Sequence, residues 1–578
     1  MEYDFYPQPI DAAKHAGHLE RREALIDYVQ KLPALEVPRS SKLLSEHLPR
    51  LMNIASREDA EMEDLPLEYQ QEVLDSMASA LTAEFLLSIS GPGDEYPMLA
   101  VLEVLLGGIA MEPGRSREVA VSAFRDMLTK MNAEAVKQVM LSSLCCLADN
   151  RGSSKSRQSA SELLGDVYLA VGDNSEAKET IRNVTIALSK DVMTAIVVSV
   201  SRSLTVCLDR GISADEIDSF ILPLYEEFKK DEHPHVRSGA CDILLSLVAR
   251  GGRFRDIASS GLNACIQDRH WSVRLIVANH FPKFYDALGP DLATRKGLAH
   301  LLNRLLGDVN LLVRQKSLEI LKETMESMER EIFIEFVAPT FMSLACDLFS
   351  QVRLALAQNI EAIWAYMNDV NSNMTIDPVL IDILSALLQD SESTQVLLCT
   401  LDNLLSETIV KDIPIDSTLH HKLEAYIARA LGQIVDLKDK QWRFRQFALD
   451  MVPDLVSTYF TSGDEVPLIG VLRSMVSALH DPVWSVRMSA TDNIPKFMSA
   501  ISAKACYPAL KTKAMEAIVV TVRNSSSHAA RTAALIVLNS LMSIFEVKSC
   551  TPHKLCCPSS TVPCQRALCR IYALRLMY

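Results

Sequence analysis

Apolar residues along the central part of the chain recur with the spacing of an amphipathic helix. Apolar or small side chains fill positions i, i+4 and i+8, as in Val236, Ala240 and Leu244. This spacing puts them on one stripe of a 3.6-residue helix, which another element must cover. A second amphipathic run precedes each such stretch, for example over residues 298–306. The pattern predicts pairs of helices joined by short turns.

The clearest helix pairs carry an aspartate in the turn and, six residues later, an arginine that opens the second helix. Successive arginines are 37, 40 and 39 residues apart, then 92 across one degenerate copy, then 42. That period is too long for ankyrin or tetratricopeptide repeats and fits two-helix HEAT repeats, with armadillo repeats as close relatives. The offset of six is kept in Asp231/Arg237, Asp268/Arg274, Asp308/Arg314, Asp347/Arg353, Asp439/Arg445 and Asp481/Arg487.

The repeated acid and base predict a structural role. An aspartate just before a helix can cap its amino end and meet its dipole. We expect the aspartates and arginines of neighbouring repeats to form a ladder of ion pairs that fixes the stacking register. Three departures from the pattern are visible: the fifth unit, near Asp191, has lost the arginine, the tenth carries Val396 in its place, and the thirteenth has Arg531 but Ser525 instead of the acid.

A single helix pair cannot cover both of its apolar faces, so neighbouring pairs must stack. Composition agrees, because 48% hydrophobic but only 6% aromatic residues describe many small aliphatic seams. We therefore predict an all-α fold, an α-solenoid (superhelical horseshoe) of about 13 HEAT repeats over residues 5–545. The weaker early repeats include the ones with Arg117 and Arg157.

The last residues, 549–578, differ from the rest. Five of the 13 cysteines and His553 lie there, but no CxxC pair is present and the spacing matches no familiar zinc finger. We expect a Cys-rich tail that is disordered or non-native, with a zinc site as the alternative. The other cysteines lie on apolar helix faces, which suits reduced thiols in a cytosolic protein.

The sequence offers little chemistry. It contains no HExxH, GxxxxGK or GxGxxG motif, so we expect no enzyme activity, no cofactor and no metal site. A net charge of −15 argues against general nucleic-acid binding, and no apolar run has the length of a membrane helix. We expect a chain without nucleic-acid or membrane partners, located in the cytoplasm and also, as a second compartment, in the nucleus.

Three turns carry a tryptophan three residues before the arginine: Trp271, Trp442 and Trp484. One interpretation is that the indole packs against the neighbouring repeat. The other is that an exposed Trp beside Arg anchors a partner protein, because these residue types dominate interface hot spots.

The turns at 438–445 and 267–274, KDKQWRFR and QDRHWSVR, resemble the eleventh- and seventh-repeat turns of the scaffold subunit of protein phosphatase 2A. Tyr6-Pro7, the loop 90–96 and Glu112-Pro113 follow in the same order as in that family. The likeness covers roughly residues 5–545.

The resemblance implies a non-catalytic scaffold with two partners. A serine/threonine phosphatase catalytic subunit would bind repeats 11–13, through Trp442, Arg443, Arg445, Trp484 and Arg487. An exchangeable regulatory (B-type) subunit would bind repeats 1–8, through Arg117, Arg157, Arg237, Trp271 and Arg274. The family has fifteen repeats, whereas this pattern stops after the thirteenth, so we expect weakened but detectable binding of the catalytic subunit.

Two alternatives within the class of binding proteins stay open. One is a HEAT regulatory subunit of another type-2A-like phosphatase. The other is an armadillo-like transport adaptor, which would present a ladder of Trp and Asn, and four Trp in the whole chain do not show such a ladder.

Overall fold

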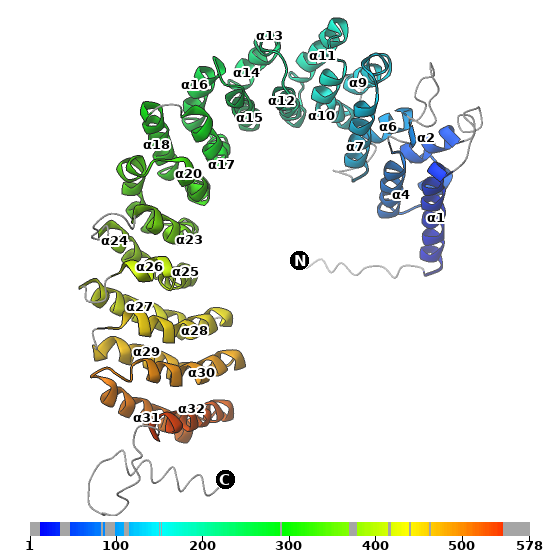
Figure 1. The fold of residues 1–578 in the computed structure, drawn as a ribbon. Coiled ribbons are helices and arrows are strands. Elements are labelled where there is room, and N and C mark those ends of the chain that lie inside the picture. The colour runs from blue at the N-terminus through cyan, green and yellow to red at the C-terminus, as the bar shows by residue number, and fades with distance from the viewer. Residues whose placement is uncertain are drawn as a thin grey trace, which may run out of the picture. The chain divides into compact units, whose positions relative to one another are not determined.

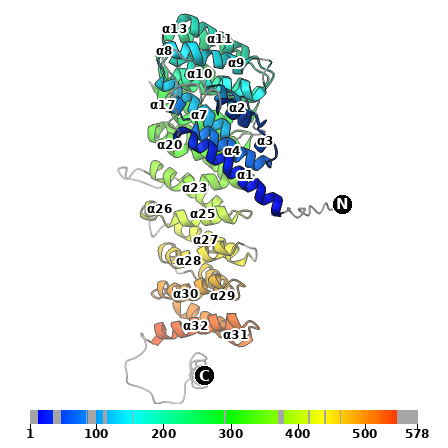
Figure 2. The same cartoon turned by 90° about the vertical axis from the view of Figure 1, so that its right-hand side faces the viewer.

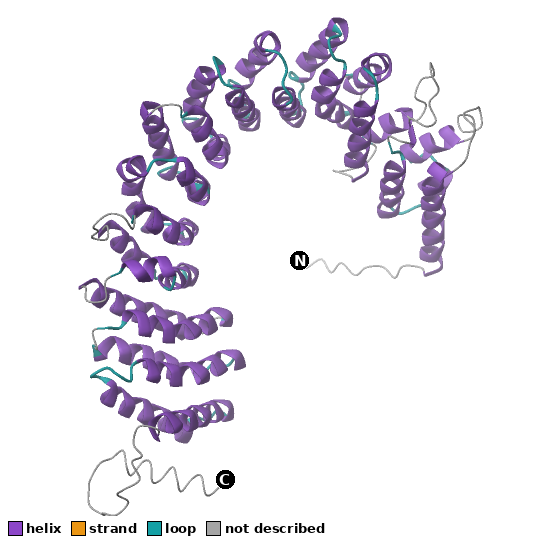
Figure 3. Ribbon diagram, viewed as in Figure 1, coloured by secondary structure: helices purple, strands orange, loops and turns teal. Residues whose placement is uncertain are grey.

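The computed structural model describes residues 12–34, 47–82, 85–86, 99–108, 115–149, 151, 153–289, 292–368, 378–413, 418–437, 441–461 and 464–546. Several regions lie outside these residues, so the predictions made for them stay predictions: Tyr6-Pro7, the loop 90–96, Glu112-Pro113, Asp439 and the Cys-rich tail. Within the described residues every regular element is a helix (Figure 3).

The chain divides into two compact units, residues 1–288 and 289–578. The longer helices of the first unit are α1 (Ala12–Lys31), α2 (Leu48–Ser56), α4 (Leu67–Ala80), α6 (Leu99–Leu106), α7 (Arg115–Lys130), α9 (Leu141–Ala148), α10 (Ser154–Ala170), α11 (Ser175–Leu188), α12 (Thr194–Asp209), α14 (Leu222–Phe228), α15 (Pro234–Arg250), α16 (Phe254–Ile266) and α17 (Trp271–Leu288).

The second unit is also built from helical hairpins, each with a first and a second helix. Its helices are α18 (Leu292–Leu306), α19 (Leu311–Glu319), α20 (Leu321–Ser327), α22 (Phe341–Ala345), α23 (Ser350–Met367), α24 (Pro378–Leu387), α25 (Thr394–Leu404), α26 (Glu407–Asp412), α27 (Thr418–Asp436), α28 (Trp442–Tyr459), α29 (Glu465–Ala478), α30 (Trp484–Ala500), α31 (Tyr507–Asn524) and α32 (His528–Glu546).

Each unit has two layers of helices. The second helix of one hairpin packs against the second helix of the next, as α10, α12, α15 and α17 do in the first unit and α28, α30 and α32 in the second. The first helices form the other layer, with α27 against α29 and α29 against α31. Figures 1 and 2 show these last hairpins as successive steps of one stack. The prediction of an all-α solenoid is confirmed.

The predicted apolar stripe is the core. Val236, Ala240 and Leu244 of α15 are fully buried or nearly so, as are Val486, Ala490 and Ile494 of α30. The small alanine in the middle of each stripe allows the neighbouring helix to approach closely. The stripe that the sequence predicts is therefore buried in both helices, and in α15 the buried Ile243 and Leu247 widen it.

The three second helices that begin with a tryptophan share a further feature that the sequence pattern alone did not reveal. Each has a proline inside the helix, eleven residues after the tryptophan: Pro282 in α17, Pro453 in α28 and Pro495 in α30. A proline removes one backbone donor and crowds the preceding turn, which bends a helix. These hairpins are thus one subtype of the repeat.

Candidate protein-binding turns

The turns of the clearest hairpins are built around the repeated offset of aspartate and arginine. In the hairpin of α15, one terminal nitrogen of Arg237 donates to the backbone carbonyls of Asp231 (2.8 Å) and Glu232 (2.9 Å). The other side of the guanidinium donates to both carboxylate oxygens of Asp268, in the next hairpin, at 2.7 and 2.8 Å. The arginine therefore closes its own turn and joins it to the following one.

The same ion pair recurs along the chain, and we call it the Asp–Arg ladder. In every case the arginine reaches forward to the aspartate of the following hairpin, with N–O distances of 2.6 to 2.7 Å. The predicted ladder is confirmed by Arg157–Asp191, Arg237–Asp268, Arg314–Asp347, Arg353–Asp390 and Arg445–Asp481. Arg117 also makes a two-pronged pair with the next hairpin, at 3.0 and 3.2 Å, but its partner Glu162 lies inside α10 and not in the turn.

The offset of six residues has a physical reason. Six residues after the aspartate, the arginine side chain returns to that residue's own carbonyl oxygen, as in Arg353 to Asp347 and Arg487 to Asp481, both at 2.6 Å. Bidentate, charge-assisted bonds of this kind are the strong ones. A lysine could not make both contacts, because it lacks the planar fork of donors.

The aspartates act slightly differently from the expected helix cap. The Asp231 carboxylate accepts from the N–H of His233 at 2.7 Å, and His233 is itself the residue before α15. Asp481 likewise accepts from Val483 at 2.8 Å, just before α30. The acid therefore holds the turn that leads into the helix, not the free N–H groups inside the first helical turn.

The ladder shifts the titration of its members. Burial alone would raise the pKa of Asp268, but hydrogen bonds from Arg237 and from the His270 N–H outweigh it, and the pKa is lowered. Asp390 behaves in the same way beside Arg353. The Asp390 hydrogen bond in turn raises the pKa of Arg353, against the effect of burial. The carboxylates of Asp268 and Asp390 are thus held in their ionised form.

One step of the ladder is missing in the first unit. Val197 stands six residues after Asp191, where an arginine would otherwise reach the carboxylate of Asp231. Val197 is buried, and the described residues supply no ion pair to Asp231. A cavity of about 300 Å³ lies there, lined by Asp191, Val197, Asp231 and His233 among others. The degenerate fifth repeat therefore has a physical gap where the guanidinium is lost.

The three turn tryptophans all begin a second helix: Trp271 in α17, Trp442 in α28 and Trp484 in α30. Trp484 is 66% exposed and Trp271 is 36% exposed, whereas Trp364, inside α23, is 0% exposed. Trp442 is half-buried and lies under the exposed guanidinium of Arg443, whose carbon is 5.0 Å from the ring centre. Tryptophan in these turns is therefore not a core residue.

The ladder places two of these tryptophans in adjacent hairpins. Arg445 lies three residues after Trp442, and its partner Asp481 lies three residues before Trp484. Helices α28 and α30 also pack directly against each other. The ion pair thus fixes the two tryptophan-bearing turns beside each other, with Arg443 on the exposed side.

The other residues predicted to bind partners lie deeper. Four of these arginines are buried and one, Arg157, is half-buried; the buried ones are Arg117, Arg237, Arg274 and Arg445. Arg274 donates to the Asp268 carbonyl at 2.7 Å and so closes the Trp271 turn. Arg487 is half-buried and donates to the carbonyls of Asp481 and Pro482. These arginines hold the turns, and the tryptophans and Arg443 form their exposed surface.

The residue directly after the aspartate was missed as a surface feature. Val192, Val309 and Leu348 occupy this position and are 97%, 92% and 88% exposed. Phe349, next to Leu348, is also exposed and lies 5.9 Å from the Arg314 guanidinium carbon. The sequence could have revealed this feature, because an apolar residue directly after a turn aspartate is too far from the helix core to be buried.

Two searches bear on other kinds of site. Among the described residues, no group of three or more His, Cys, Asp or Glu side chains is arranged to hold a metal ion. No described helix combines the length and the apolar character needed to cross a membrane.

Comparison with known proteins gives structural matches only. No family model matches the sequence, and no curated protein matches it. A crystal structure of importin β from ammonium sulfate is similar over 94% of this chain and 72% of that chain, with a TM-score of 0.50 and 11% identity. Yeast importin β (Kap95p) is similar over 93% and 71% of the two chains, with a TM-score of 0.44 and 11% identity. The first match shows a shared fold: this chain is a helical solenoid of the HEAT-repeat type.

Proposed function

We propose that the chain is a non-catalytic scaffold subunit of a protein phosphatase 2A-like serine/threonine phosphatase. The catalytic subunit would bind repeats 11–13 and an exchangeable regulatory subunit would bind repeats 1–8. The observation that carries the proposal is the surface formed by Trp442, Arg443 and Trp484 on two hairpins joined by the Arg445–Asp481 pair.

This surface has the properties of a protein-binding anchor. A largely exposed indole gains no burial in the free chain, whereas a partner that covers it removes a large apolar area from water. Tryptophan and arginine are the side chains most enriched in interface hot spots. The buried ion pair below orients both turns before a partner arrives, so little side-chain entropy is lost on binding.

A second surface in the first unit suits a different partner. Trp271 begins α17, is partly exposed and stacks with His270 at a ring separation of 5.8 Å. The buried Arg274 fixes the turn from within. The family resemblance assigns this repeat to the regulatory subunit. Trp271 belongs to the first compact unit, whereas Trp442 and Trp484 belong to the second, which supports two independent docking sites.

The mechanism would be one of effective concentration. A scaffold that binds both subunits converts their encounter into an intramolecular one. A substrate selected by the regulatory subunit would then be held near the phosphatase active site, and the scaffold itself would carry no catalytic group.

The second candidate is a transport adaptor. It is favoured by the similarity to importin β at a TM-score of 0.50, although 11% identity supports only the common fold. An adaptor would bind cargo or a transport GTPase through the same solenoid. The two hypotheses differ in the proteins recovered with the chain.

Affinity purification with mass spectrometry separates them. The full chain is expected to recover a type-2A phosphatase catalytic subunit, and a Trp442→Ala/Arg443→Ala variant is expected to lose it. Trp271→Ala is the matched control: it should lose a regulatory subunit and retain the catalytic one. Equal recovery of phosphatase by all three chains would exclude the Trp442 surface as the phosphatase-binding site. Recovery of transport proteins alone would favour the adaptor hypothesis.

A further inference from the structure

Two cysteines meet between the hairpins of α15 and α17. The Sγ atoms of Cys241, in α15, and Cys265, in α16, are 2.7 Å apart, and both residues are free thiols. A disulfide sets the two sulfurs about 2.05 Å apart, so bond formation requires only a small shift. No other pair of described cysteines has its sulfur atoms in recorded contact.

The neighbouring contacts on the same two helices hold this pair in place. One turn before Cys241 and one turn after Cys265, Arg237 and Asp268 form a ladder ion pair. On the other side, Gly261 lies against Leu244, where an added Cβ would be 2.7 Å from a leucine methyl carbon. The two helices therefore run antiparallel in a fixed register, and a side chain at position 261 would push them apart.

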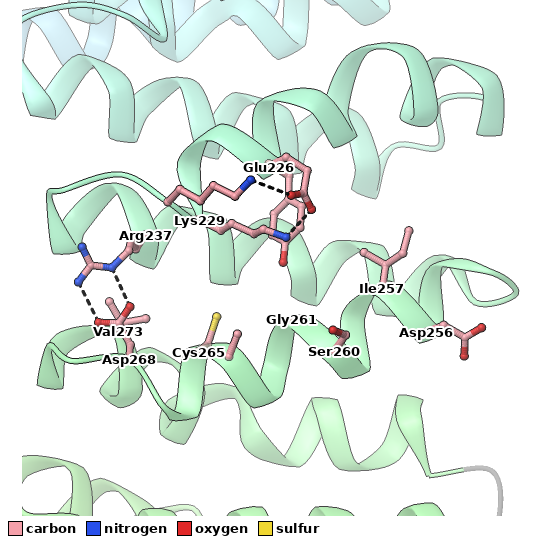
Figure 4. Close-up of a pocket in the computed structure, with 13 residues that line it drawn as sticks. Glu226, Lys229, Arg237, Asp256, Ile257, Ser260, Gly261, Cys265, Asp268 and Val273 are labelled. Carbon is pink, nitrogen blue, oxygen red and sulfur yellow. Dashed lines mark hydrogen bonds and ion pairs between the residues drawn. The ribbon is translucent and has the colours of Figure 1, made fainter.

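Access to the two thiols is unequal. Cys241 is buried, whereas Cys265 is partly exposed and lines a cavity of about 540 Å³. Figure 4 shows the Cys265 sulfur directed from α16 into the space that Lys229, the residue directly after α14, borders on the other side. This cavity is large enough to admit a small oxidant to Cys265.

The surroundings of Cys241 also shift its titration. The hydrogen bond to Cys265, together with burial, raises the pKa of Cys241 well above its ordinary value. Cys241 therefore remains a protonated thiol at neutral pH. The partly exposed Cys265, which lines the cavity, is the thiol that a small oxidant reaches first.

We propose that Cys241 and Cys265 are a redox modification site that a peroxide converts into a disulfide. The Cys265 thiolate attacks one peroxide oxygen, the S–O bond forms, the O–O bond breaks, and the leaving hydroxide takes up a proton and departs as water. The Cys241 sulfur then attacks the Cys265 sulfenic acid. The S–S bond forms, the S–O bond breaks, and the hydroxide leaves as water with the Cys241 proton. The two thiols lose two electrons in all, and hydrogen peroxide is reduced to two waters.

The product would join neighbouring repeats covalently. Helix α15 is the second helix of one hairpin and α16 is the first helix of the next, which leads into the Trp271 turn. A bond between them would restrain the opening of this pair of hairpins. This inference does not depend on the phosphatase scaffold proposal.

The test uses the reduced full chain. After treatment with hydrogen peroxide, remaining thiols are blocked with N-ethylmaleimide and the unreduced digest is examined by mass spectrometry. The expected result is a cross-linked peptide pair containing Cys241 and Cys265, which disappears after dithiothreitol. Amide exchange in α16 should slow on the order of tenfold in the oxidised chain.

Variants assign the order of events. Cys241→Ser should leave a Cys265 sulfenic acid that dimedone traps, and Cys265→Ser should leave Cys241 unreactive. Cys207→Ser, at a buried cysteine of α12, should form the cross-link as the unaltered chain does. In the unaltered chain, labelling of Cys241 and Cys265 should be lost together. Loss of labelling at Cys265 alone, or no cross-linked pair, would overturn the proposal, as would equal oxidation of Cys241 in Cys265→Ser.

Discussion

Arg445 and Asp481 join two successive hairpins through a buried ion pair, with the arginine Nε 2.7 Å from one carboxylate oxygen. Their side chains are only 2% and 8% exposed. Three residues from each partner, on the outside, stand Trp442 and Trp484. A buried structural contact therefore sets the spacing of two surface residues, which connects the stacking of the repeats with the proposed binding surface.

Breaking this pair should destabilise the second unit strongly. Arg445→Ala leaves Asp481 partly buried without its partner, and such losses cost about 3–5 kcal/mol. Arg531→Ala is the matched control, because Arg531 closes its turn through the Ser525 carbonyl at 2.7 Å and forms no ion pair with a carboxylate of the described residues. The urea midpoint from far-UV circular dichroism should fall much further for Arg445→Ala. Equal shifts in the two variants would show that the carboxylate contact adds nothing.

Restoring the missing arginine should stabilise the first unit. In Val197→Arg the new guanidinium can enter the adjacent cavity of about 300 Å³ and pair with Asp231. We expect a gain of roughly 1 kcal/mol in the free energy of unfolding, since charge-assisted hydrogen bonds are offset by burial of a charge. Val197→Met controls for the added bulk. If Met stabilises the chain more than Arg, the site is an apolar void and not a gap in the ladder.

Acid should weaken the ladder over a defined range of pH. The pKa values of Asp191, Asp268 and Asp390 are lowered below the ordinary 3.8 by hydrogen bonds that outweigh burial. Their contribution to stability is therefore complete above about pH 4 and is lost as the pH falls through the lowered folded values. Unfolding midpoints measured from pH 7 downward should decline below this value.

Asp268→Asn should be less stable than the unaltered chain at neutral pH and should lose less stability in acid. The exposed Asp173→Asn is the control and should follow the original curve. A decline that is equally steep in Asp268→Asn would assign the acid sensitivity to other carboxyl groups.

Truncation of the core tryptophan should lower the stability of the chain far more than truncation of a turn tryptophan. Trp364→Ala removes a fully buried side chain from α23, at a cost of about 3–5 kcal/mol. Trp484→Ala removes a side chain that is 66% exposed and should change stability by less than about 0.5 kcal/mol. Thermal unfolding distinguishes the two. A large loss in Trp484→Ala would mean that the indole packs against its neighbours in solution.

Much of the fold could be predicted because the repeat states it many times. The apolar stripe seen in Val236, Ala240 and Leu244 recurs in other second helices, and the fixed offset of Asp and Arg marks six of the turns. Which aspartate each arginine pairs with was harder to predict from the sequence. The Arg237 guanidinium pairs with the carboxylate of Asp268, 31 residues ahead, and contacts Asp231 only at its backbone carbonyl. Sequence spacing alone does not distinguish these two partners.

The candidate site was predictable in part. Trp271, Trp442 and Trp484 are at the start of second helices, as their offset from arginine indicated. The burial of Arg237 and Arg445 could not be predicted. An arginine next to a turn is usually exposed, and these two become buried only because they contact another repeat. The proximity of Cys241 and Cys265 depends on helix register in the same way.

The most direct test of the account is the affinity of the full chain for a purified phosphatase 2A catalytic subunit, measured by isothermal titration calorimetry. We predict saturable binding with one catalytic subunit for each chain, weakened at least ~10-fold in Trp442→Ala, because a hot-spot tryptophan contributes more than 1.4 kcal/mol. Trp271→Ala should bind as the unaltered chain does. No binding, or the same affinity in all three chains, would contradict the claim that the Trp442 surface holds the phosphatase.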